Sequence, residues 1–277
     1  MDPSRVLLVL HRPSSAENLG AVARVMKNFG LPRLAVVEPL AWGGRPRSGR
    51  GATAREDVLA RARTTARRAG DLLSRVELYR DLSSALASTT WACGTTSRAV
   101  EGRPALTPRK LAAEVARRAR RGLVAVVLGE ERRGLSDAEL ELCQAVCTIP
   151  TGAEYDSMNL AQAAAVLCYE LALAAGRPGP RATARLAPAR NEALRGGLPP
   201  GAAGRGDPAR HATVEALWGR LAALLGLAGY LNPQNPGHIL REWRRFLARA
   251  EPTQREVELL MAAARALERS LRLGRGG

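Results

Sequence analysis

Short aliphatic runs alternate with helical patterns through the first 175 residues of the chain. Strands that alternate with amphipathic helices in this way are typical of a parallel sheet with helices packed on it. We therefore predict an α/β domain in this part of the chain. The predicted strands are residues 6–10, 34–37, 76–79, 89–93, 123–128 and 146–149.

Capping signals mark several helix starts between these strands. A Ser or Thr followed three residues later by Glu forms a capping box, and Pro favours the first helical position. The predicted N-termini are Ser14 with Glu17, Thr53 with Glu56, Ser136 with Glu139, and Thr107 before Pro108.

The composition changes after residue 176. Residues 177–210 are rich in Pro, Gly and Arg and lack apolar periodicity, which predicts a basic linker. Three helices are predicted beyond it, at residues 212–227, 237–249 and 254–272, and Thr253 with Glu256 opens the last one. We therefore expect an α/β domain at residues 1–176, a linker at 177–210 and a small all-α module at 211–277. The middle helix has one apolar face, formed by Ile239, Leu240, Trp243, Phe246 and Leu247, and a basic face formed by Arg241, Arg245 and Arg249.

The charge balance predicts a polyanionic partner. The 277 residues include 42 Lys and Arg against 26 Asp and Glu, which leaves a formal charge of +16. A GC-rich genome would explain the preference for Arg over Lys, but it would not explain the net charge. With 46% hydrophobic and 4% aromatic residues, the chain should fold around an aliphatic core.

Cysteine usage and apolar run length favour a cytoplasmic protein. Cys93, Cys143, Cys147 and Cys168 lie in apolar segments without metal-ligand spacing, so we expect buried free thiols and no metal. The N-terminus lacks the pattern of a signal peptide, and no apolar stretch is long enough to span a membrane.

The segment from Asn18 to Gly30 follows the first predicted strand. On a helical wheel its apolar residues cluster on one side, so Arg24 faces away from the core. Arg24 is either a solvated arginine or a functional one. Gly20 favours a function, because a glycine in the first turn costs helix stability and suggests that something approaches the backbone closely.

Two further segments combine strand ends with polar loops. Residues 124–136 form a strand that ends at Gly129 and continues through Glu131 and Gly134 into a capped helix. Ligands bind α/β sheets at such strand ends, although any connection from strand to helix has a similar pattern. The acidic residues in this loop argue against a dinucleotide or ATP site.

Residues 148–159 precede a helix at 160–173 that is apolar all round, which Asp156 or Ser157 would cap. Such a helix needs cover from its own sheet and, we expect, from a second subunit.

Together, the three segments resemble the signature motifs of the SPOUT superfamily of RNA methyltransferases, in its ribose 2′-O-methyltransferase branch. Their order, spacing and sheet context agree over residues 1 to about 175. The loop at residues 94–98 and the segment at 229–236 with its following helix resemble the bacterial tRNA (cytidine/uridine-32) 2′-O-methyltransferases, which modify the anticodon loop. Met158 stands where the family usually has Leu, a conservative difference.

The resemblance implies a doubly wound, mostly parallel α/β sheet whose C-terminal part, about residues 123–173, threads into a trefoil knot. It also implies that S-adenosylmethionine binds in the knot, largely through backbone groups, and that no metal takes part. The implied cofactor-binding residues are Thr95, Leu128, Gly129, Ile149, Ser157 and Met158.

The family's acceptor chemistry implies a role for Arg24 at the ribose 2′-hydroxyl. A guanidinium has a pKa above about 12, so stabilising a developing alkoxide and gripping a phosphate suit it better than accepting a proton. Asn18 and Glu131 would orient Arg24 or the ribose, and Ser157 with Asn159 would complete the pocket. Family members are homodimers, so Arg24 is expected to serve the partner's cofactor site.

Several basic side chains are candidates for contact with RNA. Arg98, Arg132 and Arg133 are expected in loops at the same end of the sheet, and Arg241, Arg245 and Arg249 form a stripe on the C-terminal module. For both sets the alternative is a solvated surface.

Three other functions compete with tRNA methylation. A ribosomal RNA methyltransferase of the same branch is the main alternative. An RNA-binding protein that had lost catalysis would have no need to retain Arg24, Glu131, Ser157 and Asn159 together. A DNA-binding regulator would need a recognition helix, and residues 232–236 form a rigid connector that is poorly suited to a helix-turn-helix.

Overall fold

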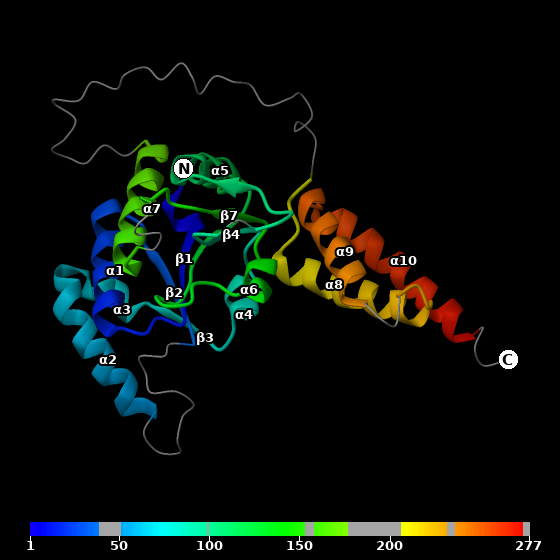
Figure 1. Ribbon diagram of the computed structural model, residues 1–277, viewed down its shortest axis with the longest axis horizontal. Helices are drawn as coiled ribbons and strands as arrows, with labels where there is room; N and C mark the ends of the chain where they lie inside the picture. Colours follow the sequence, from blue (N-terminus) through cyan, green and yellow to red (C-terminus); the bar gives the residue numbers. More distant parts are fainter. Residues whose placement is uncertain (39–50, 99, 153–157, 177–205, 232–235, 274–277) are drawn as a thin grey trace.

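The computed structural model describes residues 1–38, 51–98, 100–152, 158–176, 206–231 and 236–273 (Figure 1). Its first part is built on a 7-stranded sheet with the order β3-β2-β1-β6-β4-β7-β5, in which every pair is parallel. The strands are β1 (Val6–His11), β2 (Arg33–Val37), β3 (Glu77–Tyr79), β4 (Trp91–Thr95), β5 (Ala105–Leu106), β6 (Val124–Leu128) and β7 (Ala145–Cys147).

Helices cover both faces of this sheet, and three more form the C-terminal module. On the sheet lie α1 (Ala16–Phe29), α2 (Gly51–Ala66), α3 (Gly70–Ser74), α4 (Leu82–Leu86), α5 (Pro108–Arg118), α6 (Asp137–Glu141) and α7 (Leu160–Ala174), with short 3-10 turns at Pro3–Arg5 and Arg67–Ala69. The module contains α8 (His211–Leu227), α9 (Pro236–Ala250) and α10 (Gln254–Leu273).

The strand residues alternate between two apolar cores. On one face Leu8 and Val126 pack with α1, α2, α3, α5 and α7, and on the other Leu7 and Val127 pack with α4 and α6. Both faces are therefore buried, as continuous aliphatic runs require. This is the predicted doubly wound α/β fold (Figure 1).

The predicted elements are largely confirmed, with differences at their ends. All six predicted strands are present; β5, which has only two residues, was missed. The capping boxes at Ser136 and Thr253 and the Thr107 cap are formed.

Three predicted helix caps were wrong. The N-cap of α1 is Ser15 rather than Ser14, and α2 begins at Gly51, before Thr53. The N-cap of α7 is Asn159, whose Oδ1 accepts from the Ala161 N–H at 2.9 Å. Asp156 and Ser157 lie outside the described residues.

The predicted knot involves residues 123–173, of which 153–157 lie outside the described part, so the threading stays a prediction. The four cysteines are free and buried, as predicted, and burial raises the pKa of Cys143, Cys147 and Cys168 to about 12. Among the described residues, no helix is both long and apolar enough to cross a membrane.

The C-terminal module is docked on the α/β domain. The backbone N–H groups of His211 and Ala212 donate to Thr89 and Ala87 at 2.7 and 3.2 Å, next to the start of β4. Residues 206–210, predicted as linker, belong to this module: Ala209 donates to the Pro252 carbonyl, and Pro208 bridges Thr253 just before α10.

Gly20 lets α1 and α2 pack closely. A Cβ atom there would lie 2.0 Å from the Ala62 carbonyl oxygen and 2.1 Å from Thr65 Oγ1. The close approach predicted from this glycine is therefore made by a neighbouring helix of the same chain, and Gly20 gives no support to a ligand site.

We predict that Gly20→Ala destabilises the fold by about 1–3 kcal/mol, because the obstructing group is backbone and cannot rotate away. Thermal unfolding measures the effect as a lower Tm. Gly219→Ala in α8 is the matched control, since nothing lies within 4 Å of a Cβ at that position. The control should be neutral or stabilising by up to about 1 kcal/mol. Equal Tm values for the two variants would contradict this packing role.

Candidate functional site

A cavity of about 360 Å³ lies at the carboxyl ends of β4, β6 and β7. This volume is in the range of small-molecule sites, and parallel sheets bind ligands at this edge. Five of the six predicted cofactor-binding residues line it: Thr95, Leu128, Gly129, Ile149 and Met158. The sixth, Ser157, lies outside the described residues.

One wall of the cavity is a tight loop after β6. A Cβ atom at Gly129 would lie 2.3 Å from the carbonyl carbon of Gly134, so only glycine allows the loop to fold back on itself. The Gly134 N–H donates to the Glu130 carbonyl at 2.8 Å, and Gly134 has a φ of +66°. The two glycines thereby close the loop and turn its backbone along the cavity.

The opposite wall is the end of β4 at Thr95 and the loop after it, which carries Thr96, Ser97 and Arg98. The Arg98 guanidinium forms an ion pair with Asp137 at 2.7 Å and donates to the Leu135 carbonyl at 3.3 Å. This arginine, predicted to bind RNA, therefore also holds the two walls together.

A chain of side-chain hydrogen bonds runs along the rim. Glu131 Oε2 accepts from the Ser14 N–H at 3.0 Å and from its Oγ at 2.9 Å, and Oε1 accepts from Asn18 Nδ2 at 2.9 Å. Asn18 Oδ1 in turn accepts from Asn159 Nδ2 at 3.2 Å. The structure thus brings three predicted catalytic residues together: Asn18, Glu131 and Asn159. Sequence reasoning missed Ser14 as a member of the site, because its spacing to Glu17 was interpreted as a capping box.

These hydrogen bonds keep Glu131 ionised. Burial raises the pKa of the Glu131 carboxyl, but the donors Asn18 and Ser14 lower it by more, so that it lies below its ordinary value. A carboxylate that accepts three hydrogen bonds is a fixed anchor for the segments that supply them.

Arg24 lies apart from this chain of hydrogen bonds. Its side chain is exposed on α1 and forms no ion pair with any described residue. One turn further, Lys27 Nζ pairs with Asp71 at 2.6 Å. Arg132 and Arg133 are exposed beside the cavity. All three arginines are accessible to a ligand.

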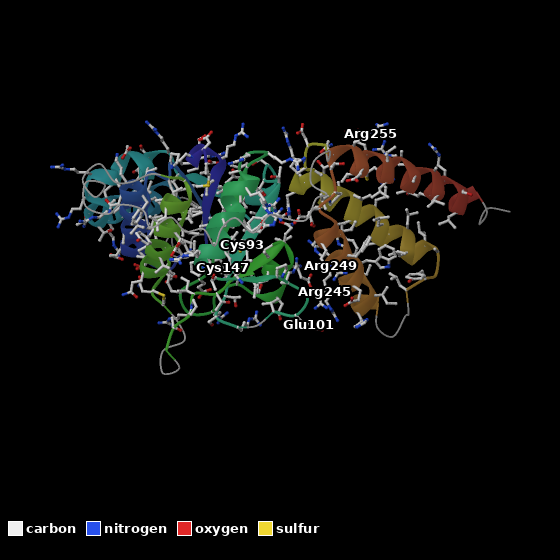
Figure 2. All side chains as sticks on the ribbon, turned by 90° about the horizontal axis from the view of Figure 1, so that it is seen from above. Cys93, Glu101, Cys147, Arg245, Arg249 and Arg255 are labelled. Carbon is white, nitrogen blue, oxygen red and sulfur yellow. The ribbon has the colours of Figure 1, made fainter. Side chains whose placement is uncertain are left out.

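The predicted basic stripe of α9 divides into two parts. Arg241 and Arg249 are exposed, whereas the Arg245 side chain is only 23% exposed and pairs with Glu242 at 3.0 Å and with Glu101 at 3.6 Å. Arg245 therefore contacts the loop between β4 and β5, and Figure 2 shows it at the junction of the two domains.

Comparison with known proteins identifies the family. Residues 5–169 match the SpoU rRNA Methylase family, and residues 212–276 match the C-terminal domain of the tRNA methyltransferase TrmJ. The first match covers more than half of the chain. The chain belongs to the SpoU methylase family.

Individual family members align over nearly the whole chain. A tRNA (cytidine/uridine-2′-O-)-methyltransferase TrmJ from Yersinia pestis (strain Pestoides F) is 30% identical, with 95% of this chain and 91% of that protein covered. The protein of the same name from Cronobacter sakazakii is 29% identical, with 96% of each covered. The crystal structure of TrmJ from Z. mobilis ZM4 has a TM-score of 0.71 at 26% identity and covers 95% of this chain and 98% of that one. The similarity therefore includes the C-terminal module as well as the SpoU domain.

Within the described part of the chain, no group of three or more His, Cys, Asp or Glu side chains could hold a metal ion. The polar groups that do converge are amides, hydroxyls, a carboxylate and arginines, which suit hydrogen bonding to a polar organic ligand.

We predict a pH-dependent contribution of Glu131 to stability. Because the pKa of Glu131 is lowered in the folded state, its ionised form stabilises the protein above the unfolded pKa of about 4.3, and this stabilisation is lost as the pH falls through the folded pKa. The Tm difference between wild type and Glu131→Gln should therefore be constant above about pH 5 and shrink below about pH 4.

Glu130→Gln is the matched control, because this neighbouring carboxylate interacts with His11 by charge and not through hydrogen bonds of the kind that Glu131 accepts. It should lower Tm less than Glu131→Gln at neutral pH. A Tm difference for Glu131→Gln that stays constant from pH 7 to pH 3 would exclude the anchoring role.

Proposed function

We propose that this chain transfers a methyl group from S-adenosylmethionine to the 2′-hydroxyl of a ribose in tRNA, at cytidine or uridine 32 of the anticodon loop. The observation that carries the proposal is the cavity at the carboxyl edge of the sheet, whose lining includes every described residue that the family motifs assign to the cofactor. Curated relatives that align over nearly the whole chain act on cytidine and uridine in tRNA by their names, which supports the substrate.

The lining of the cavity fits S-adenosylmethionine. Leu128, Ile149 and Met158 offer apolar surface to an adenine ring, and the Thr95 to Ser97 loop offers hydroxyl and backbone groups to polar atoms. When bound, this cofactor supplies a methyl group on a positively charged sulfur. Ser157, outside the described residues, stays a predicted cofactor-binding residue.

Arg24 would act on the ribose that accepts the methyl group. Its guanidinium is permanently charged, so it would stabilise negative charge that develops on the 2′-oxygen and bind the neighbouring phosphate. Methyl transfer needs an in-line approach, and the hydrogen-bonded rim of Asn18, Glu131 and Asn159 would fix the ribose for it.

A homodimer would bring Arg24 to a cavity. In the described chain Arg24 has no partner, and the neighbouring α7 exposes apolar surface: Tyr169 is 50% and Leu173 is 51% exposed, and Tyr169 packs edge-on against Phe29 of α1. Such surface on two packed helices is typical of a subunit interface. We place the dimer interface there and the activity in the cytoplasm.

Methylation of ribosomal RNA is the second candidate function, because the family that matches residues 5–169 is named for rRNA methylation. Incubating the purified chain and labelled S-adenosylmethionine with tRNA transcripts or ribosomal RNA fragments separates the two. Mapping the 2′-O-methylated nucleotide should locate it at position 32 of tRNA. Methylation of ribosomal RNA alone would overturn the tRNA assignment.

Arg24→Ala should reduce methyl transfer by a factor of about 100 or more, because one charged donor to a developing oxyanion contributes that much. Binding of S-adenosylhomocysteine, measured by calorimetry, should stay within about twofold, since Arg24 is assigned to the acceptor. Arg75→Ala, at another exposed arginine, is the control and should leave both unchanged. Retention of most of the activity in Arg24→Ala would exclude its catalytic role.

Heterodimers test whether Arg24 acts across the interface. Thr95→Arg places a bulky charged side chain in the cavity, and its loss of S-adenosylhomocysteine binding is verified first. Mixing it with Arg24→Ala should restore up to about a quarter of wild-type activity per total subunit, because one intact site can form in the mixed dimer. No restoration after verified subunit exchange would place the whole site in one subunit.

A further inference from the structure

The C-terminal module exposes an aromatic pair on α9. Trp243 and Phe246 have ring centroids 6.0 Å apart and ring planes at 88°. Their exposed fractions are 37% and 52%. The sequence predicted both on the apolar face of this helix together with Leu247, but of these three only Leu247 is buried, at 6% exposure.

Aromatic side chains are scarce in this chain. It has 4 Trp, 4 Tyr and 2 Phe among 277 residues, and its core is almost wholly aliphatic. Two adjacent aromatics left in water on one helix face therefore indicate a binding surface. In this edge-to-face contact the edge of one ring covers one face of the other, and the partial exposure of both rings leaves aromatic surface free for a flat ligand.

One exposed positive charge, that of Arg249, lies beside the pair. Arg249 follows Phe246 by one helical turn, is exposed, and forms no ion pair with any described residue. Glu242, one turn before Phe246, is engaged by Arg245 at 3.0 Å. A polyanion with flat rings is thus the ligand that fits this face in charge and in shape.

The pair also lies on a helix that borders the catalytic domain. Arg245 on α9 pairs with Glu101 at 3.6 Å, and its Cδ lies 2.9 Å from the Cβ position of Gly102. Glu101 and Gly102 belong to the connection between β4 and β5, which begins with the cavity-lining residues Thr96, Ser97 and Arg98. Figure 2 shows Glu101, Arg245 and Arg249 at this junction.

We propose that Trp243 and Phe246 stack on an unpaired nucleobase of the RNA substrate while Arg249 contacts an adjacent phosphate. This inference rests on the proposed function, because it takes RNA as the substrate. The base must be unpaired, since a base inside a duplex has no face available for stacking. The site extends RNA recognition from the catalytic cavity to the C-terminal module.

Three double variants test the aromatic pair. Trp243→Ala with Phe246→Ala removes the stacking surface, and Trp243→Phe with Phe246→Tyr retains it. Leu259→Ala with Leu260→Ala is the matched control, because it removes exposed apolar side chains from α10, where they are 54% and 43% exposed. Dissociation constants for tRNA and for a single-stranded oligoribonucleotide are measured in the presence of S-adenosylhomocysteine.

The alanine pair should bind both RNAs roughly tenfold more weakly, the effect of losing one base stack. The dissociation constants of the Trp243→Phe, Phe246→Tyr variant and of the leucine control should stay within about twofold of wild type. KM for tRNA should rise in the alanine pair while kcat at saturating tRNA is retained, because the cavity is untouched. Unchanged affinity of the alanine pair would overturn the proposal.

Two further measurements separate stacking from other roles. The slope of the logarithm of the binding constant against the logarithm of the salt concentration should be unchanged in the alanine pair. In Arg249→Ala it should become shallower by roughly 0.7–0.9, which corresponds to the loss of one phosphate contact. Sedimentation should give the same oligomeric state for the alanine pair and wild type. A loss of self-association would instead assign the face to a second copy of the chain and overturn the RNA proposal.

The two proposals fail separately. Binding to RNA is measured without turnover, so wild type that binds RNA through Trp243 and Phe246 but methylates none would contradict only the proposed function. If wild type methylates tRNA and the alanine pair does so with the same KM, only the stacking site would be contradicted.

Discussion

The carboxylate of Glu131 joins three segments that lie far apart in the sequence. It belongs to the loop after β6, and it accepts hydrogen bonds from Ser14, just before α1, and from Asn18, within the first turn of α1. Asn18 passes the connection to Asn159, which caps α7. An ionised carboxylate that accepts from several donors fixes their positions strongly. If the carboxylate moved away, all of these donors would lose their acceptor in a partly buried place. The rim of the cavity therefore depends on one charge.

The order of the strands explains why these segments can meet. β1 and β6 are neighbours, β4 lies beside β6, and β7 lies beside β4. Since all strands are parallel, the loops that follow them emerge at one edge, although they are separated by most of the domain in sequence. The apolar strands thus determine where the polar loops gather, and the polar loops need only local devices, such as the glycines at 129 and 134, to shape the cavity.

Much of this could be predicted from the sequence, because strands and helix caps have local signals. The aliphatic runs predicted six of the seven strands, and five of the six predicted cofactor-binding residues line the cavity. Local signals failed where a residue's partner is distant. Gly20 was interpreted as a sign of close approach to the backbone that favours a function, but α2 makes that approach. Ser14 has cap spacing, but it binds Glu131. Apolar periodicity predicted that the aromatic pair lies on the apolar face of α9. It could not predict whether another element covers that face.

Arginine contacts with α6 connect the C-terminal module to the domain that contains the cavity. Arg244 of α9 donates to the carbonyl of Glu141 at the end of α6 at 3.4 Å, and Arg103 donates to the same carbonyl at 3.0 Å. Burial lowers the pKa of Arg103, yet two carbonyl acceptors hold its guanidinium in place. The α6 helix also carries Asp137, which pairs with Arg98 at the cavity wall. Arginines therefore join both ends of α6, one to the cavity and the other to the module. With the module fixed in this way, α9 has a defined position relative to the cavity, so that the proposed RNA contacts of the two domains would be made at a fixed separation.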